Sequence, residues 1–191
     1  MSEAFLFLIK AILDLISLAI LIAFFFRLLK VDFYNPLVQG LLKISNIFTS
    51  PFKLLIKPTA SIDLTGLLTA YFFQVLGFFL ITLAGNSSYE ITTMLLWSGF
   101  SIILIGLNIT WWVLLVGIII SWVAPMSIHP AVSLLKQMSE KICTPFRLIL
   151  PPMGGLDFSP ILAFLLLQFI LRAVLNLSVD FGLPIGLSLG T

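Results

Sequence analysis

Cysteine, histidine and charged residues are all scarce in this chain. Among 191 residues there is one cysteine, Cys143, and one histidine, His129, and only 9% of the residues are charged. One cysteine excludes an internal disulfide and any multi-thiolate metal site, and a histidine beside Pro130 fits a helix cap better than a catalytic base. No phosphate loop, Gly-x-Ser-x-Gly elbow or His-Glu-x-x-His pair occurs. We therefore expect no enzymatic activity, metal or cofactor, and the net charge of +2 argues against a nucleic-acid partner.

Apolar sequence is what the chain has in excess. Hydrophobic residues make up 60% of it, and the mean hydropathy is +1.20. A helix needs about 20 apolar residues to cross a bilayer core of roughly 30 Å, and four runs reach that length, at about 4–26, 64–84, 91–123 and 160–181. The third run is long, so we expect it to tilt or to begin as a surface helix before a span at about 95–123. The predicted fold class is an all-α membrane protein with four transmembrane helices, because the runs lack the alternation of a barrel.

An internal repeat without gaps divides the chain into two units. Positions from about Val31 to Gln74 have counterparts 94 residues later. The matched residues include Pro36 and Pro130, Ser45 and Ser139, the runs 50–53 and 144–147, Asp63 and Asp157, and Gln74 and Gln168. Because such a repeat is one module used twice, we expect a first repeat at 1–90 and a second at 91–191. Each would hold two spans joined by an amphipathic segment, and both would have the same orientation.

The amphipathic segments lie at 36–58 and 130–152. Their apolar residues recur every three or four positions opposite a polar stripe, which predicts helices in the membrane interface. A polar residue precedes each proline, in the pairs Asn35-Pro36, Ser50-Pro51, His129-Pro130 and Thr144-Pro145. An N-cap followed by proline is typical of a helix start. We therefore expect each segment to be a pair of short in-plane helices broken at its second proline.

Basic residues orient the chain. Those in the amphipathic segments are Lys43, Lys53, Lys57, Lys136, Lys141 and Arg147, and the loop at 85–90 has none. Because short loops rich in Lys and Arg stay cytoplasmic, we predict that both segments face the cytoplasm and that both termini are outside. The segments are either struts on the membrane surface or a platform. A platform would bind anionic lipid headgroups or an acidic protein partner, at about 1 kcal/mol per basic residue.

Several motifs resemble the YggT family, also called YlmG-like, of small bacterial inner-membrane proteins with plastid relatives. They are the run 32–36, the turns Pro51-Phe52-Lys53 and Pro145-Phe146-Arg147, Ser121-Trp122, and the run 150–160. The resemblance covers nearly the whole chain and implies a two-repeat, multi-pass protein of the cytoplasmic membrane. It also implies a link to resistance to osmotic shock, while related proteins are associated with cell-division gene neighbourhoods and plastid membrane assembly. The first copy lacks the glycines, so any role of Gly154 and Gly155 belongs to the second copy alone.

Two aspartates occupy the same place in the two repeats, just before the second span. Asp63 and Asp157 could each cap the first turn of the helix that follows and favour its positive end. The alternative is a cation or lipid-headgroup site formed between them. Both interpretations are compatible with the sequence.

Charged residues inside the predicted spans are the strongest pointers to function, because they are costly there and need partners. Lys10 and Asp14 are four residues apart and share a helix face. At about 1.5 Å per residue, Asp14 and Arg172 lie roughly 15 and 14 Å from the outer ends of their spans. One hypothesis pairs these two across the repeats; the other pairs Asp14 with Lys10 and leaves Arg172 to water, lipid phosphate or another subunit. Gln74 and Gln168 could bond across a pseudo-two-fold axis or line a narrow path.

Two classes of non-enzymatic function follow. The first is osmotic-stress resistance or ion homeostasis, with a channel or transporter built as a homo-oligomer, because four helices enclose little space. The second is a membrane scaffold or assembly factor that presents the basic amphipathic helices to a cytoplasmic partner, in cell division or the biogenesis of a membrane complex. In the second class the charges inside the spans only hold the bundle together.

Overall fold

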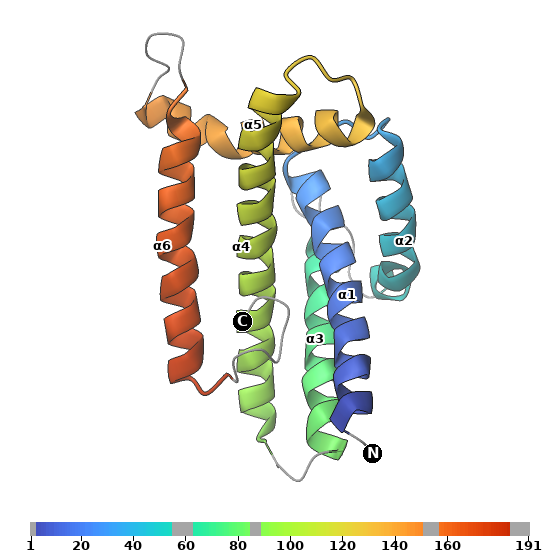
Figure 1. Cartoon of the computed structure of the whole chain (residues 1–191). Coiled ribbons are helices and arrows are strands. Elements are labelled where there is room, and N and C mark those ends of the chain that lie inside the picture. The colour runs from blue at the N-terminus through green and yellow to red at the C-terminus, as the bar shows by residue number, and fades with distance from the viewer. Residues whose placement is uncertain (1–2, 55–62, 85–88, 151–156, 184–191) are drawn as a thin grey trace.

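Six helices and no strand make up the part of the chain that the computed structural model describes, residues 3–54, 63–84, 89–150 and 157–183 (Figure 1). They are α1 (Glu3–Leu28), α2 (Pro36–Lys53), α3 (Leu64–Ala84), α4 (Ile91–Val123), α5 (Pro130–Ile149) and α6 (Ser159–Asp180). Four of them, α1, α3, α4 and α6, are long and apolar enough to cross a membrane. The predicted all-α class with four spans is therefore confirmed.

The structure favours one of the two alternatives that the sequence left open for the third span. Helix α4 runs unbroken from Ile91 to Val123, so the described chain has no separate surface helix before it. Its 33 residues make it about 50 Å long at 1.5 Å per residue, which exceeds a bilayer core of roughly 30 Å. Part of α4 must therefore tilt or extend beyond the apolar core.

The proline-broken helix pairs expected in each repeat are wrong. Pro51 lies inside α2 and Pro145 inside α5, so within the described residues neither proline breaks its helix. Two residues of α2 follow Pro51 and four residues of α5 follow Pro145, so each proline lies in the last part of a helix and does not begin one. Thr144 also does not act as an N-cap, because its hydroxyl donates to the Glu140 carbonyl one turn back, at 2.8 Å.

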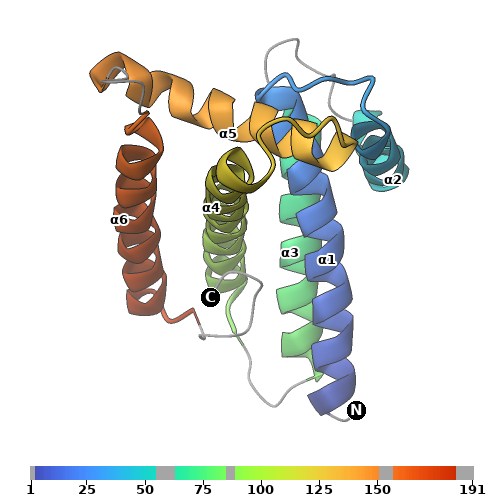
Figure 2. The ribbon, with the colours of Figure 1, turned by 45° about the horizontal axis from the view of Figure 1, so that its top comes forward.

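The two amphipathic helices are also oriented differently. In both views α5 lies across one end of the bundle (Figures 1 and 2), whereas α2 runs beside α1 in Figure 1. Helix α2 buries Val38, Ser45 and Thr49, and it packs on both α1 and α3. Helix α5 thus lies across the ends of the spans, whereas the small buried side chains of α2 let it lie close against α1 and α3.

Polar caps join the two repeats at this end of the bundle. The Asn35 carboxamide accepts from the Leu37 N–H at 2.9 Å, and His129 Nδ1 accepts from the Ala131 N–H at 3.2 Å. Asn35 and His129 therefore cap α2 and α5 as predicted. The amide of Asn35 also donates to the Pro130 carbonyl at 2.8 Å, so one repeat's cap holds the start of the other's helix.

The apolar core lies between α1, α3 and α4, with α2 and α5 closing one end. Ile20 and Leu21 of α1 and Ile105 of α4 are almost completely buried in it, together with Val38 and Met138 from α2 and α5. Helix α6 stands at the edge of the bundle and packs against α4 and α5 (Figure 1). Cys143 lies in a smaller cluster that joins these three helices, as a buried apolar side chain. Three spans thus form the core, and the fourth stands outside it.

Candidate functional site

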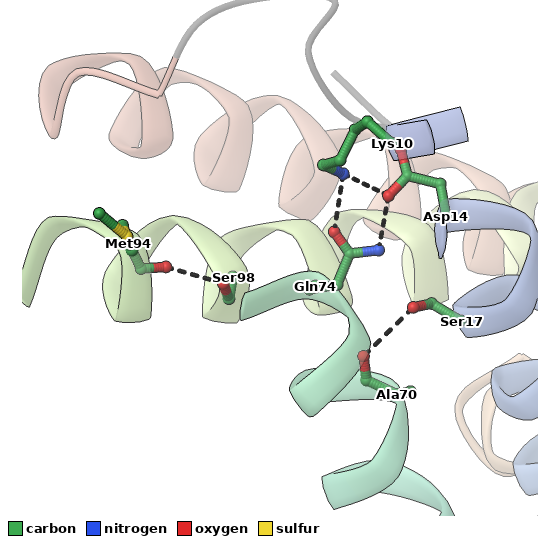
Figure 3. A network of polar contacts seen from close by, with 7 residues as sticks. All are labelled: Lys10, Asp14, Ser17, Ala70, Gln74, Met94 and Ser98. Carbon is green, nitrogen blue, oxygen red and sulfur yellow. Dashed lines mark hydrogen bonds and ion pairs between the residues drawn. The ribbon is translucent and has the colours of Figure 1, made fainter. Parts of the chain in front are cut away.

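A closed polar network lies inside the first repeat, between α1 and α3. The ammonium of Lys10 forms an ion pair with Asp14 and donates to Gln74 Oε1 at 3.1 Å. Gln74 Nε2 in turn donates to Asp14 Oδ1 at 2.9 Å. Figure 3 shows the three side chains facing one another in a triangle. All three are at most 3% exposed, so the charges balance each other without solvent.

The surroundings of this network hold Lys10 in place. Its ammonium lies 4.8 Å from the centre of the Phe78 ring, a distance typical of a cation–π contact. Gly77 faces the aliphatic part of the lysine. One turn further along α1, the Ser17 hydroxyl donates to the Ala70 carbonyl at 3.2 Å (Figure 3). The network therefore joins α1 to α3 along a buried seam, which is a structural role for charged groups inside a span.

This network decides between the two pairing hypotheses. Asp14 pairs with Lys10, and the predicted Asp14–Arg172 pair is wrong in the isolated chain. Arg172 lies exposed on α6, which does not pack against α1. Gln74 bonds within its own repeat and not with Gln168, which is half-buried on α6. Both cross-repeat pairs fail for the same reason, because α6 stands apart from the helices that carry their partners.

The turn aspartates both accept from a backbone N–H at the start of a helix. Asp63 Oδ1 accepts from the Gly66 N–H at 3.1 Å, at the start of α3. Asp157 Oδ1 accepts from the Ser159 N–H at 2.9 Å, at the start of α6. The capping interpretation thus fits Asp63, while Asp157 bonds the first N–H of α6 from one residue before the N-cap, Phe158. The second carboxylate oxygen of each is already paired with a guanidinium, Arg27 for Asp63 and Arg147 for Asp157, which leaves little attraction for a free cation.

The ionisable groups Asp157 and Lys53 near the α5 end have shifted pKa values, each with its own causes. Burial raises the pKa of Asp157, but hydrogen bonds from Ser159 and Arg147 outweigh it and hold the pKa below its ordinary value. Burial also lowers the pKa of Lys53, with a further contribution from the nearby Arg27 guanidinium. Asn46 Oδ1 bridges these two cations, accepting from Lys53 at 2.7 Å and from Arg27 at 3.4 Å. Asp157 is therefore ionised at neutral pH and fixes the start of α6.

A groove of about 810 Å³ lies between α4, α5 and the start of α6. Four charged residues line it, Lys136, Glu140, Arg147 and Asp157, beside apolar residues that include Trp122. The ammonium of Lys136 donates to the carbonyls of Ala124 and Pro125, at 3.0 and 2.6 Å, just beyond the C-terminus of α4. A cation is favourable at that position. The groove thus combines an apolar wall with charges of both signs.

The sequence did not reveal this groove, although two signals for it were present. Gly117 of α4 lies so close to α5 that a Cβ there would come within 2.5 Å of the Ser139 side chain. Ser121 and Trp122, which carried the family resemblance, both line the groove.

A second cavity of about 590 Å³ lies between α1, α4 and α5 and is lined almost entirely by apolar side chains. Neither cavity contains the Lys10–Asp14–Gln74 network.

The remaining predicted site residues lie at the α5 end of the bundle or close to it. Lys43, Lys53, Lys141, Pro36, Pro51 and Pro145 are exposed, while Pro130, Phe52 and Phe146 are half-buried. Phe52 packs on Phe72 of α3, with ring centres 5.2 Å apart. Lys57, Gly154 and Gly155 lie outside the described residues. The basic side chains therefore do not converge on one point but spread over this end of the molecule.

Comparison with known proteins finds relatives along nearly the whole chain. The profile of a family described as CCB3/YggT matches residues 96–178. An uncharacterized protein of Pseudomonas aeruginosa is 34% identical over 99% of this chain and 98% of its own length. The uncharacterized protein YggT of Escherichia coli strain K12 is 33% identical over 86% of this chain and 85% of its own. No solved structure matches. The two relatives thus match over both halves of the chain, whereas the family profile matches the second half.

Proposed function

This chain belongs to the YggT family and is a multi-pass membrane protein; we propose that it works without catalysis as a scaffold or assembly factor in the bacterial inner membrane. In this proposal the α5 end faces the cytoplasm and holds a partner protein, and the buried charges only join the helices. Its resemblance to a family linked with osmotic shock makes survival of osmotic stress the phenotype to measure.

One observation carries the proposal: the charges buried between α1 and α3 are closed off from solvent, and several of those at the α5 end are exposed. Lys10, Asp14 and Gln74 bond to one another and are buried. At the α5 end, Lys43 and Lys141 are exposed and Trp122 is 84% exposed beside the groove. Exposed aromatic side chains are typical of interaction sites, and lysines around them attract a partner of opposite charge. The surface that can meet a partner is thus at the end that the distribution of Lys and Arg predicts to be cytoplasmic.

Acidic segments of a cytoplasmic protein fit this end best. Lys43 and Lys141 supply long-range attraction, and the groove adds an apolar wall with Trp122 as an anchor. Anionic lipid headgroups would also be attracted to the lysines. They would compete with a partner but would not use the groove in a sequence-specific way.

Photo-cross-linking from the groove tests the scaffold proposal. A photoreactive residue replaces Trp122, with Tyr34, 90% exposed at the same end but outside the groove, as the matched control site. We expect a discrete protein adduct from position 122 that is lost when Lys43 and Lys141 are both changed to Glu. Osmotic-shock survival should fall in the same double variant. An adduct that is equally strong at position 34, or that survives the charge reversal, would contradict the proposal.

Ion handling is the second candidate, and the buried network favours it. Charged groups inside a span often mark an ion pathway, and an oligomer could align several copies of the network. In that case Asp14→Asn would abolish osmotic protection in protein that is still present at normal levels. The scaffold proposal predicts instead that Asp14→Asn loses osmotic protection only in proportion to the loss of folded protein.

A further inference from the structure

Arg172 is a charged residue on the membrane-facing side of a span. It lies 13 residues after Ser159 and eight before Asp180, which is about 20 Å and about 12 Å from the two ends of α6. Its side chain is exposed and makes no hydrogen bond or ion pair with the described residues. A guanidinium at this depth needs a counter-charge or an acceptor.

The position of Arg172 on the helix turns it away from the bundle. Helix α6 buries Ala163 and Leu167 on the side that meets α4 and α5. Arg172 follows Leu167 by five residues, which places it about 140° around the helix. Its neighbours on this outer face, Leu165 and Phe169, are 63% and 71% exposed. We call these residues, together with the exposed Asn176 one turn on, the α6 outer face.

The counterparts of these α6 positions in the first repeat lie on α3, where they are packed against a neighbouring span. Phe78 of α3, 94 residues before Arg172, is buried, and Gln74 beside it bonds to Asp14 of the neighbouring span. In the second repeat α4 carries Asn108 where α1 carries Asp14. Asn108 donates to the Leu104 carbonyl on its own helix. The second repeat therefore has the cation on its last span without the carboxylate that the first repeat provides.

A second copy of this chain does not supply that carboxylate. Of its eight acidic residues, Asp14 is the one in the interior of a span, and Lys10 and Gln74 already bond to it. The others lie at helix ends, in loops or on α5: Glu3, Asp32, Asp63, Glu90, Glu140, Asp157 and Asp180. Two copies related by an axis along the membrane normal would also set Arg172 against Arg172. Charge complementarity thus points to another protein.

We propose that the α6 outer face is the docking surface for a transmembrane helix of a partner protein that carries an Asp or Glu at the depth of Arg172. A carboxylate can accept two parallel bonds from the guanidinium, a geometry that lysine does not reproduce. Gln168 and Asn176, one turn before and after, add amide groups to the same stripe. This surface lies in the membrane and is separate from the groove at the α5 end, so it does not depend on the scaffold proposal.

Cross-linking in native membranes tests the assignment. A photoreactive residue replaces Phe169 in the full-length chain, and the matched control replaces Phe79 of α3, which is 49% exposed. Each is combined with Arg172→Leu and with Arg172→Lys. We expect an adduct at position 169 but not 79, weakened more than about tenfold by Arg172→Leu and partly by Arg172→Lys. The thermal unfolding midpoint of Arg172→Leu should be unchanged, because the side chain makes no bond within the described chain.

Identification of the adduct completes the test. The cross-linked peptide, read by mass spectrometry, should come from a transmembrane helix with an Asp or Glu at matching depth, and changing that acid to Asn or Gln should abolish the adduct. An adduct made only of two copies of this chain, a partner helix without an acid, or labelling of lipid alone would overturn the proposal. The Lys43→Glu, Lys141→Glu double variant should leave this adduct intact, which separates its failure from that of the scaffold.

Discussion

Gly77 of α3 lies directly against Lys10 of α1, so that a Cβ at position 77 would come within 2.6 Å of the lysine Cδ. Lys10 cannot move aside freely, because its ammonium is held by Asp14 and Gln74. A glycine is therefore required where the two spans approach each other. The relationship makes the network a joint between helices that depends on close packing as well as on charge.

Gly77→Ala should destabilise the protein. We expect a loss of about 1–3 kcal/mol, typical of overpacking, despite the higher helix propensity of alanine. Gly99→Ala is the matched control, because a Cβ at Gly99 meets nothing within 4 Å. Unfolding of both variants in detergent measures the difference. Equal stabilities for the two would show that Lys10 yields at no cost.

Removing one charge of the buried pair should be worse than removing both. Lys10→Met leaves Asp14 without its cation, and we expect a loss of about 3–5 kcal/mol or a protein that does not accumulate. Lys10→Met combined with Asp14→Leu should recover much of that loss, because no unpaired charge remains. Membrane protein levels and unfolding midpoints report the recovery. A double variant as unstable as the single one would show that the network contributes more than charge balance.

Close contact between α4 and α5 predicts a specific rescue. Gly117→Ala should disturb the groove, because its Cβ would lie 2.5 Å from the Ser139 side chain. Ser139→Gly removes the clashing atoms. The double variant Gly117→Ala, Ser139→Gly should therefore regain the stability of the native protein, apart from a loss of about 1 kcal/mol for glycine in a helix. Ser139→Ala keeps its Cβ and should not. Unfolding midpoints compare the three variants, and rescue by both substitutions would show that the Ser139 hydroxyl, also 2.5 Å from the added Cβ, causes the clash and its Cβ does not.

Asp157 should make stability depend on pH in a defined direction. Its folded-state pKa is below the ordinary value, so its contribution is present above about pH 4, where the unfolded-state group is ionised, and is lost as the pH falls through the folded-state pKa. The carboxylate is partly exposed, so Asp157→Asn should cost less than about 1 kcal/mol at pH 7. Unfolding at pH 7 and pH 3 should show this difference shrinking at the lower pH. A stability difference that grows on acidification would contradict a lowered pKa of Asp157 in the folded state.

Local rules predicted much of the fold. Run length and hydropathy located all four spans, and the residue before Pro36 or Pro130 identified the caps at Asn35 and His129. The spacing of Lys10 and Asp14 made a local ion pair one of the two alternatives. These features depend on neighbours within a turn or on the length of a run, which a sequence displays directly.

The other predictions were wrong because they depended on contacts between residues that are far apart in the sequence. Gln74 joins Lys10 from 64 residues away, and nothing in its own surroundings distinguishes it from Gln168. The repeat suggested equivalent helix pairs, but α6 packs on its neighbours less closely than α3 does, so Arg172 and Phe78 have opposite environments. The pairs Ser50-Pro51 and Thr144-Pro145 suggested helix starts, because a polar residue before a proline is typical of an N-cap. Both prolines lie instead near the end of a helix, where the lost hydrogen bond matters less.

Ion flux through reconstituted protein tests most directly whether the buried charges are structural. Purified protein in liposomes is given gradients of potassium, sodium and protons, with folded Asp14→Asn and Arg172→Leu variants beside it. The scaffold account predicts no flux above that of empty liposomes for any of them. Flux of any of these ions that the native protein supports and Asp14→Asn abolishes would contradict it and make the Lys10–Asp14–Gln74 network part of a conducting path.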